Sequence, residues 1–133
     1  MALENIPRCS RVFPSSATSV PAARHWAQEV LARWGLAASD AELALNEMVT
    51  NAVVHGAGEI QADLTLVDAG IRIEVHDHGE VGPIVHRPSS ILHPGGRGLD
   101  IISRVSSDWG WNQAREAGTT VWAVIPGTPT RFT

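Results

Sequence analysis

Hydrophobic residues recur at helical spacing in residues 21–35. Trp26, Val30 and Trp34 are four residues apart, so their side chains fall on one face of a helix. Gly35 follows this run and is a typical residue after the end of a helix. The pattern therefore predicts an amphipathic helix over residues 21–35.

A second helix is predicted from Ser39 to Gly56. The Ser39 hydroxyl is suited to cap the first turn, and Glu42 three residues later completes a capping box. Apolar residues lie nearly all round this helix, which predicts that it is largely buried. These apolar residues are Leu43, Leu45, Met48, Val49, Ala52, Val53 and Val54.

After Gly56 the hydrophobic period changes from helical to alternating, which predicts β-strands. The expected strands are residues 60–66 and 71–75, joined by a turn at 68–70, and residues 108–113 and 119–125. Residues 11–13 are a candidate edge strand, and residues 99–105 a further helix. The sum is an α+β fold, a two-layer sandwich with helices packed on one face of a mostly antiparallel sheet.

Composition narrows the class of protein. A chain of 133 residues fits a single domain, residues 1–133, in which residues 1–20 form an N-terminal segment. A formal net charge of -4 with scattered arginines argues against direct nucleic-acid binding. Cys9 is the single cysteine, so an intramolecular disulfide is impossible. We expect a cytoplasmic protein without membrane contact, because the chain lacks a signal-peptide pattern and an apolar run of roughly 20 residues.

The second predicted helix carries a polar face whose residue types are suited to metal binding or catalysis. Glu47, Asn51 and His55 are four residues apart and therefore stack on one side of the helix. A carboxylate and a carboxamide inside a buried helix need partners, and a hydrated metal bound to phosphates is a suitable one. The alternative is a stripe of polar residues that simply faces solvent.

Asp77 stands at the end of an alternating strand, and Gly79 follows two residues later. A carboxylate in this position is able to accept a hydrogen bond from an exocyclic amino group such as that of adenine. The glycine permits close approach of a flat ring to the backbone. An ordinary Asp-x-Gly turn is the competing interpretation.

A glycine-rich segment, Gly95–Leu99, leads directly into the third predicted helix. Glycine N–H groups, the helix N-terminus and the Arg97 guanidinium together favour an anion, with phosphate the expected one. The segment lacks the spacing and the lysine of a Walker loop, and no strand immediately precedes it as in a dinucleotide-binding fold. Both of these common nucleotide folds are therefore disfavoured.

Histidines are frequent in and near this region, at positions 76, 78, 86 and 93. His76 and His78 alternate along a strand and project to the same side. Zinc is disfavoured, because no cysteine accompanies them and their spacing is irregular.

Taken in order, the motifs are more specific than any one alone. They read E-x-x-x-N-A-x-x-H-G from Glu47, D-x-G from Asp77, G-x-G-L from Gly96 and G-T-T-V from Gly118. This order resembles the GHKL, or Bergerat-fold, ATPases, over roughly residues 20–126. The segments NEMVTNAVVHG, GGRGLDII and GTTVWAVIP are most similar in sequence to those of the anti-sigma-factor serine kinase group.

The resemblance implies a role for each matching residue and implies ATP and Mg²⁺ as cofactors. Asn51 would be the magnesium ligand, and Glu47 would orient or deprotonate the nucleophile. Asp77 would bind the adenine amino group. The other implied ATP-binding residues are Gly79 against the adenine, Gly96, Arg97 and Gly98 at the phosphates, and Thr119 in support of Asp77.

The implied function is a serine/threonine protein kinase that acts as an anti-sigma factor and phosphorylates an anti-sigma-factor antagonist. Its implied partners are a sigma factor and that small antagonist protein, and whether the chain forms a homodimer stays open. The alternative is a non-catalytic, ATP-dependent protein-binding module. Two departures from the family pattern favour it: Val81 stands where a further glycine is common, and the loop up to Gly95 is short.

Overall fold

The computed structural model describes residues 6–37, 39–79, 98–114 and 117–127. These residues form three α-helices and five β-strands. In chain order the elements are β1 (Arg8–Phe13), α1 (Ser19–Arg33), α2 (Ser39–His55), β2 (Ile60–Val67), β3 (Gly70–Asp77), α3 (Gly98–Val105), β4 (Asp108–Ala114) and β5 (Gly118–Pro126). Every predicted helix and strand is present, with ends that differ by at most three residues.

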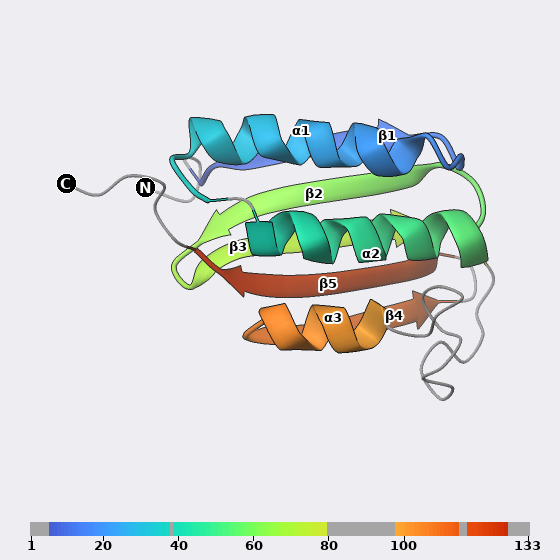
Figure 1. The fold of residues 1–133 in the computed structure, drawn as a ribbon. Helices are drawn as coiled ribbons and strands as arrows, with labels where there is room; N and C mark the ends of the chain where they lie inside the picture. The colour runs from blue at the N-terminus through green and yellow to red at the C-terminus, as the bar shows by residue number, and fades with distance from the viewer. Residues whose placement is uncertain (1–5, 38, 80–97, 115–116, 128–133) are drawn as a thin grey trace.

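The five strands form one antiparallel sheet in the order β1-β2-β3-β5-β4, and the three helices lie on one of its faces (Figure 1). This arrangement confirms the predicted α+β sandwich. The candidate edge strand is also confirmed and is longer than predicted, since it begins at Arg8. None of the described helices is long and apolar enough to cross a membrane.

The core lies between the helices and the sheet. Alternation along the strands turns one set of apolar side chains toward the helices, and these side chains are almost completely buried. They include Ile60, Ala62 and Leu64 of β2, Ile71, Ile73 and Val75 of β3, and Val121, Ala123 and Ile125 of β5. On the helical side, Val30 and Leu31 of α1 and Leu45, Met48 and Val49 of α2 fill the same core.

Helix α1 ends as its sequence indicates. Gly35 adopts a φ of 72°, which is the left-handed conformation that glycine reaches without a steric penalty. The N–H of Leu36 donates to the carbonyl of Leu31 at 3.0 Å, and the N–H of Gly35 donates to that of Ala32 at 3.0 Å. These two bonds form a Schellman motif, which satisfies the last carbonyl groups of the helix.

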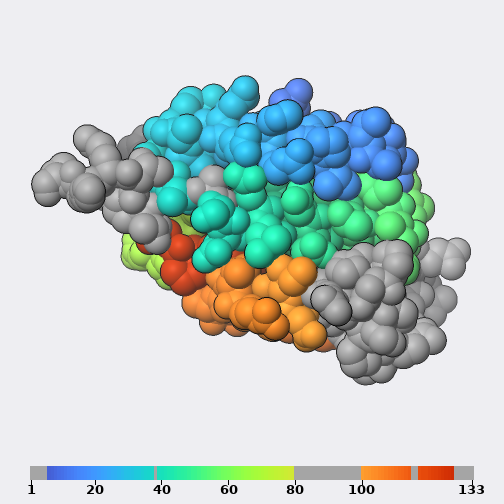
Figure 2. Space-filling view, viewed as in Figure 1, coloured from blue at the N-terminus to red at the C-terminus, as the bar shows by residue number. Residues whose placement is uncertain are grey.

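Helix α2 is largely buried, as predicted, but the apolar residues on one of its sides are exposed. Leu43 is 41% exposed and Val54 is 50% exposed. Helix α2 lies between α1 and α3 with the sheet beneath it, so its outer side stays at the surface (Figure 2). A helix in this position is covered on three sides, and apolar residues on the fourth side remain in contact with solvent.

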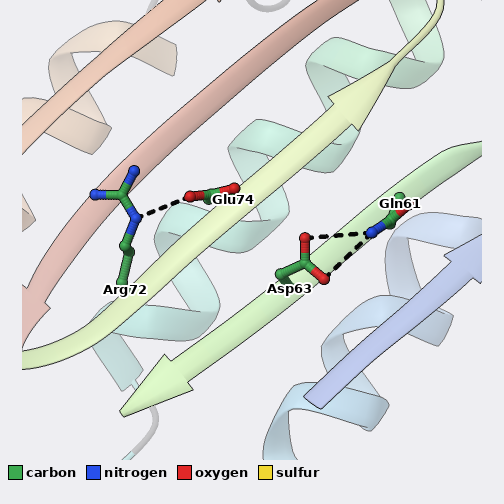
Figure 3. A network of polar contacts seen from close by, with 4 residues as sticks. All are labelled: Gln61, Asp63, Arg72 and Glu74. Carbon is green, nitrogen blue, oxygen red and sulfur yellow. Dashed lines mark hydrogen bonds and ion pairs between the residues drawn. The ribbon is translucent and has the colours of Figure 1, made fainter. Parts of the chain in front are cut away.

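Polar side chains of β2 and β3 form contacts on the face of the sheet opposite the helices (Figure 3). Arg72 and Glu74 of β3 form an ion pair with Nε and Oε2 2.9 Å apart. On β2, the side-chain amide of Gln61 donates to Asp63 at 3.4 Å, and the Ser10 hydroxyl of β1 donates to the same carboxylate. The polar half of the strand alternation therefore makes a hydrogen-bonded surface.

Candidate functional site

Asp77 is the last residue of β3, and its side chain points to the helix-covered face of the sheet. The residue is only 4% exposed. Its Oδ1 accepts a hydrogen bond from the backbone N–H of Gly79 at 2.6 Å, and the backbone N–H of Ala57 donates to the same carboxylate. The D-x-G motif thus closes a turn in which the carboxylate is held by main-chain donors from two segments of the chain.

The electrostatic environment of this carboxyl group favours its neutral form. Burial raises the pKa of Asp77 above its ordinary value of 3.8. The two backbone hydrogen bonds, and then the imidazoles of His76 and His78, lower this pKa and oppose the larger effect of burial. A buried carboxylate in such a place gains from any ligand that offers a further hydrogen-bond donor.

Three glycines surround Asp77 at distances that leave no room for a side chain. A Cβ atom at Gly56 would lie 2.5 Å from Cγ of Asp77, and one at Gly79 would lie 2.8 Å from its Oδ1. At Gly118, where φ is 89°, a Cβ atom would lie 2.0 Å from the Asp77 carbonyl oxygen. The backbones of three separate segments therefore approach this residue closely.

Thr119 lies directly opposite Asp77 in the antiparallel pairing of β3 and β5. It is 5% exposed and faces the same side of the sheet as Asp77. The G-T-T-V motif that opens β5 therefore brings a hydroxyl beside the strand end that carries the carboxylate.

Asn51 lies on α2, little more than one helical turn before Gly56. The residue is 3% exposed, and its Oδ1 has no hydrogen-bond partner among the described residues. A buried carbonyl oxygen without a partner costs roughly 1 to 3 kcal/mol. An oxygen of this kind is a ligand that Mg²⁺ accepts, so the residue fits a magnesium site.

Glu47 precedes Asn51 by one helical turn and is half-buried. Residues four apart share a face of the helix, so the two side chains lie on the same side of α2. Asn46, beside Glu47, also has a buried Oδ1 without a partner among the described residues. Asn46 was not among the predicted site residues, although its place next to Glu47 in a buried helix marks it as a polar side chain that needs a partner.

The predicted phosphate-binding segment is described only at its end. Gly98 is the first residue of α3, whereas Gly96 and Arg97 lie outside the described residues. Helix α3 packs beside α2, and its N-terminus lies at the same end of the molecule as the C-terminus of α2 and the end of β3 (Figure 1). The fold thus brings Gly98, Asn51 and Asp77 toward one end of the helical layer.

The histidines that raised the question of zinc fall into two groups. The rings of His76 and His78 contact each other edge to face, with centroids 5.1 Å apart. His86 and His93 lie outside the described residues. Within the described ranges, no group of three or more His, Cys, Asp or Glu side chains has an arrangement suited to a metal ion.

Comparison with known proteins connects this arrangement to a family. Residues 13–125 match the family model described as the histidine kinase-like ATPase domain. A search of curated protein sequences found no match.

One similar solved structure is that of the RsbU and RsbW domains of Rv1364c from Mycobacterium tuberculosis, with a TM-score of 0.68 and 24% sequence identity. The match covers 96% of this chain and 34% of the other, so this chain spans about a third of that protein's length. At this level of identity the likeness establishes the fold alone.

Proposed function

We propose that this chain, which belongs to the histidine kinase-like ATPase domain family, is an ATP-dependent serine/threonine protein kinase that acts as an anti-sigma factor. Membership of the family implies ATP binding. The proposal adds Mg²⁺, the transfer of the γ-phosphoryl group to a protein, and the residues that carry out each step.

The observation that supports the proposal best is the presence of two buried polar side chains, Asp77 and Asn51, toward one end of the molecule. Asp77 offers a desolvated carboxylate, which suits the 6-amino group of adenine. Asn51 offers a buried Oδ1 without a partner among the described residues, which suits a cation. A nucleotide bound to Mg²⁺ supplies both the amino group and the cation, separated by its ribose.

In the proposed complex, Asp77 accepts a hydrogen bond from the adenine amino group, with Gly79 against the ring and Thr119 in support. Asn51 is the protein ligand of Mg²⁺, which would neutralise the charge of the phosphates when bound. The segment Gly96, Arg97 and Gly98 contacts the phosphate oxygens.

The proposed reaction is an in-line phosphoryl transfer. A serine or threonine hydroxyl of the partner protein attacks the γ-phosphorus, the bond from this phosphorus to the bridging oxygen breaks, and ADP leaves. Glu47 orients the hydroxyl and accepts its proton. Its position on the Asn51 side of α2 supports this role.

The proposed partners are a sigma factor and the small antagonist protein that is phosphorylated. The resemblance of the α2, α3 and β5 motifs to the anti-sigma-factor kinase group supports this choice. The solved structure of the RsbU and RsbW domains has the same fold and is compatible with this choice.

A second candidate function is a non-catalytic module in which ATP controls the binding of a protein. Val81 in place of a glycine, together with the short loop that follows, favours it. In this case Glu47 would bind no reacting hydroxyl, and ATP would remain intact in the complex.

Transfer of labelled γ-phosphate separates the two functions. The chain is incubated with labelled ATP, Mg²⁺ and a purified candidate antagonist, and the Glu47→Gln variant serves as the control. Label on a serine or threonine of the antagonist, absent with the variant, supports the kinase. Stable ATP-dependent binding of the antagonist, with no label transferred to it, contradicts the kinase and supports the binding module.

A further inference from the structure

Gly56, the residue that follows α2, lies close to Asp77. A Cβ atom at Gly56 would lie 2.5 Å from Cγ and 2.6 Å from Oδ1 of Asp77, far inside van der Waals contact. The N–H of Gly56 donates to the Ala52 carbonyl at 3.0 Å, so Gly56 is held against the end of the helix. The observed position of Asp77 therefore depends on the absence of a side chain at residue 56.

Ala57, the next residue, binds the same strand end through its backbone. Its N–H donates to the Asp77 carboxylate, and its carbonyl accepts the N–H of His78 at 2.9 Å. The side chain of Ala57 is exposed. Its contribution therefore comes from the main chain, which holds the carboxylate on one side and the residue that follows it on the other.

We infer that Gly56 and Ala57 are positioning residues for recognition of the nucleotide base. They fix the acceptor oxygens of Asp77 where the 6-amino group of a purine is bound, so the helix that carries Asn51 also sets the base preference. This inference rests on the proposed function, because it requires a nucleotide at this site. The simpler alternative is that the two residues only connect α2 to the sheet.

The contact geometry indicates what a side chain at residue 56 would change. An added Cβ would lie 2.5 Å from Cγ of Asp77 and 2.6 Å from the Ala52 carbonyl oxygen, so the Asp77 carboxylate and the end of α2 must move apart. Hydrogen bonds to the carboxylate weaken steeply once distance and angle depart from their optimum. Asn51 lies within the helix, five residues earlier, and its side chain is not among the three atoms nearest to this Cβ. Gly56→Ala should therefore reduce discrimination between bases and leave binding of magnesium and phosphate in place.

The test compares dissociation constants for Mg-ATP and Mg-ITP. Inosine carries a carbonyl oxygen in place of the 6-amino group and a proton on N1, so the ITP/ATP ratio of dissociation constants reports on this contact. We expect the parent protein to prefer ATP and Gly56→Ala to reduce that preference roughly tenfold, as for a buried hydrogen bond that is lost. Asp77→Asn should reduce it similarly, and the double variant no further.

Gly35→Ala is the matched control. Like Gly56, Gly35 follows a helix, but a Cβ there would meet no atom within 4 Å. Unlike Gly56, it has a positive φ, of 72°. Its backbone strain should lower stability and leave the ATP preference at the parental value. Ala57→Pro removes the N–H and keeps the carbonyl, so it tests the same inference if Gly56→Ala does not fold.

The outcomes separate this inference from the proposed function. A folded Gly56→Ala variant with the parental base preference, beside an Asp77→Asn variant that has lost it, overturns the positioning role and leaves the proposed function standing. A parent that binds ATP and ITP equally well overturns the role of Asp77 and this inference with it. A parent that binds neither nucleotide contradicts the proposed function itself.

Discussion

The two ends of the proposed nucleotide site differ in how far the protein satisfies its own polar groups. At the adenine end, Asp77 receives backbone hydrogen bonds from Gly79 and Ala57. At the phosphate end, Oδ1 of Asn51 is buried and has no partner among the described residues. The carboxylate at the adenine end is held by the fold itself, whereas the carboxamide oxygen at the phosphate end is buried without a partner among the described residues.

This difference has an energetic meaning. A preformed acceptor loses little freedom when a ligand binds, so it favours a base that offers a matching donor over a base that does not. A buried oxygen without a hydrogen bond is destabilising, and a ligand that pairs with it recovers that cost. We therefore expect changes at the phosphate end to abolish binding or chemistry, and changes at the adenine end to alter preference.

The largest effect is expected at Asn51. Asn51→Ala should abolish magnesium-dependent nucleotide binding, because a methyl group cannot coordinate the cation, while the fold persists. Calorimetric titration with ATP, with and without Mg²⁺, measures this change. Asn46→Ala is the matched control, since residue 46 lies about 140° around the helix from residue 51. Equal loss of magnesium-dependent binding in both variants would mean that the loss is not specific to Asn51, and would contradict its role as the magnesium ligand.

A large effect on rate alone is expected at Glu47. Glu47→Gln keeps the size of the side chain but removes the proton acceptor, so phosphoryl transfer should fall by roughly a hundredfold or more. Mg-ATP affinity should stay at the parental value, because Asn51 remains. Steady-state transfer and equilibrium binding are measured on the same preparation, with Glu42→Gln as control. A parental transfer rate in Glu47→Gln would exclude Glu47 as the base.

A smaller effect is expected at the adenine end. Asp77→Asn allows an NH₂ group to face the adenine amino group, which loses about 1 to 3 kcal/mol of ATP binding and moves the preference between ATP and GTP. Competition binding of the two nucleotides measures the shift. Asp63→Asn is a matched control, because Asp63 is also buried but lies on the opposite face of the sheet. An unmoved ATP preference in Asp77→Asn would remove the distinction between the two ends.

The smallest effect is a pH dependence. The folded protein binds a proton at Asp77 more tightly than the unfolded chain, because burial raises this pKa above 3.8. The free energy of unfolding contributed by Asp77 should therefore fall as pH rises from the ordinary pKa through the raised one. Denaturant unfolding of the parent and of Asp77→Asn across this range isolates the contribution. Bound ATP should weaken this trend, since the amino group favours the ionised carboxylate.

The sequence predicted much of this architecture because the relevant signals are local. Alternation defined β2 and β3, and Gly35 marked the end of α1. It did not predict that Leu43 and Val54 are exposed, because helical periodicity does not say which side of a helix a neighbour will cover.

Among the candidate site residues, too, those with a local sequence signal were predicted, and contacts between distant parts of the chain were not. Asp77 and Asn51 were identified from their place at a strand end and in a helix. The contact of Ala57 with Asp77 joins residues 20 apart in the chain and has no local pattern. Gly56 was interpreted as a helix terminator alone, although the fold also places it against the carboxylate. The roles of all the site residues remain predictions, and Gly96 and Arg97 in addition lie outside the described residues.

The most direct test of the central claim is a crystal structure of the protein with Mg²⁺ and a non-hydrolysable ATP analogue. The account predicts that one nucleotide spans both ends, with its 6-amino group hydrogen-bonded to the Asp77 carboxylate and Oδ1 of Asn51 coordinated to the magnesium ion. A nucleotide bound elsewhere, or one whose magnesium is held without Asn51, would contradict it.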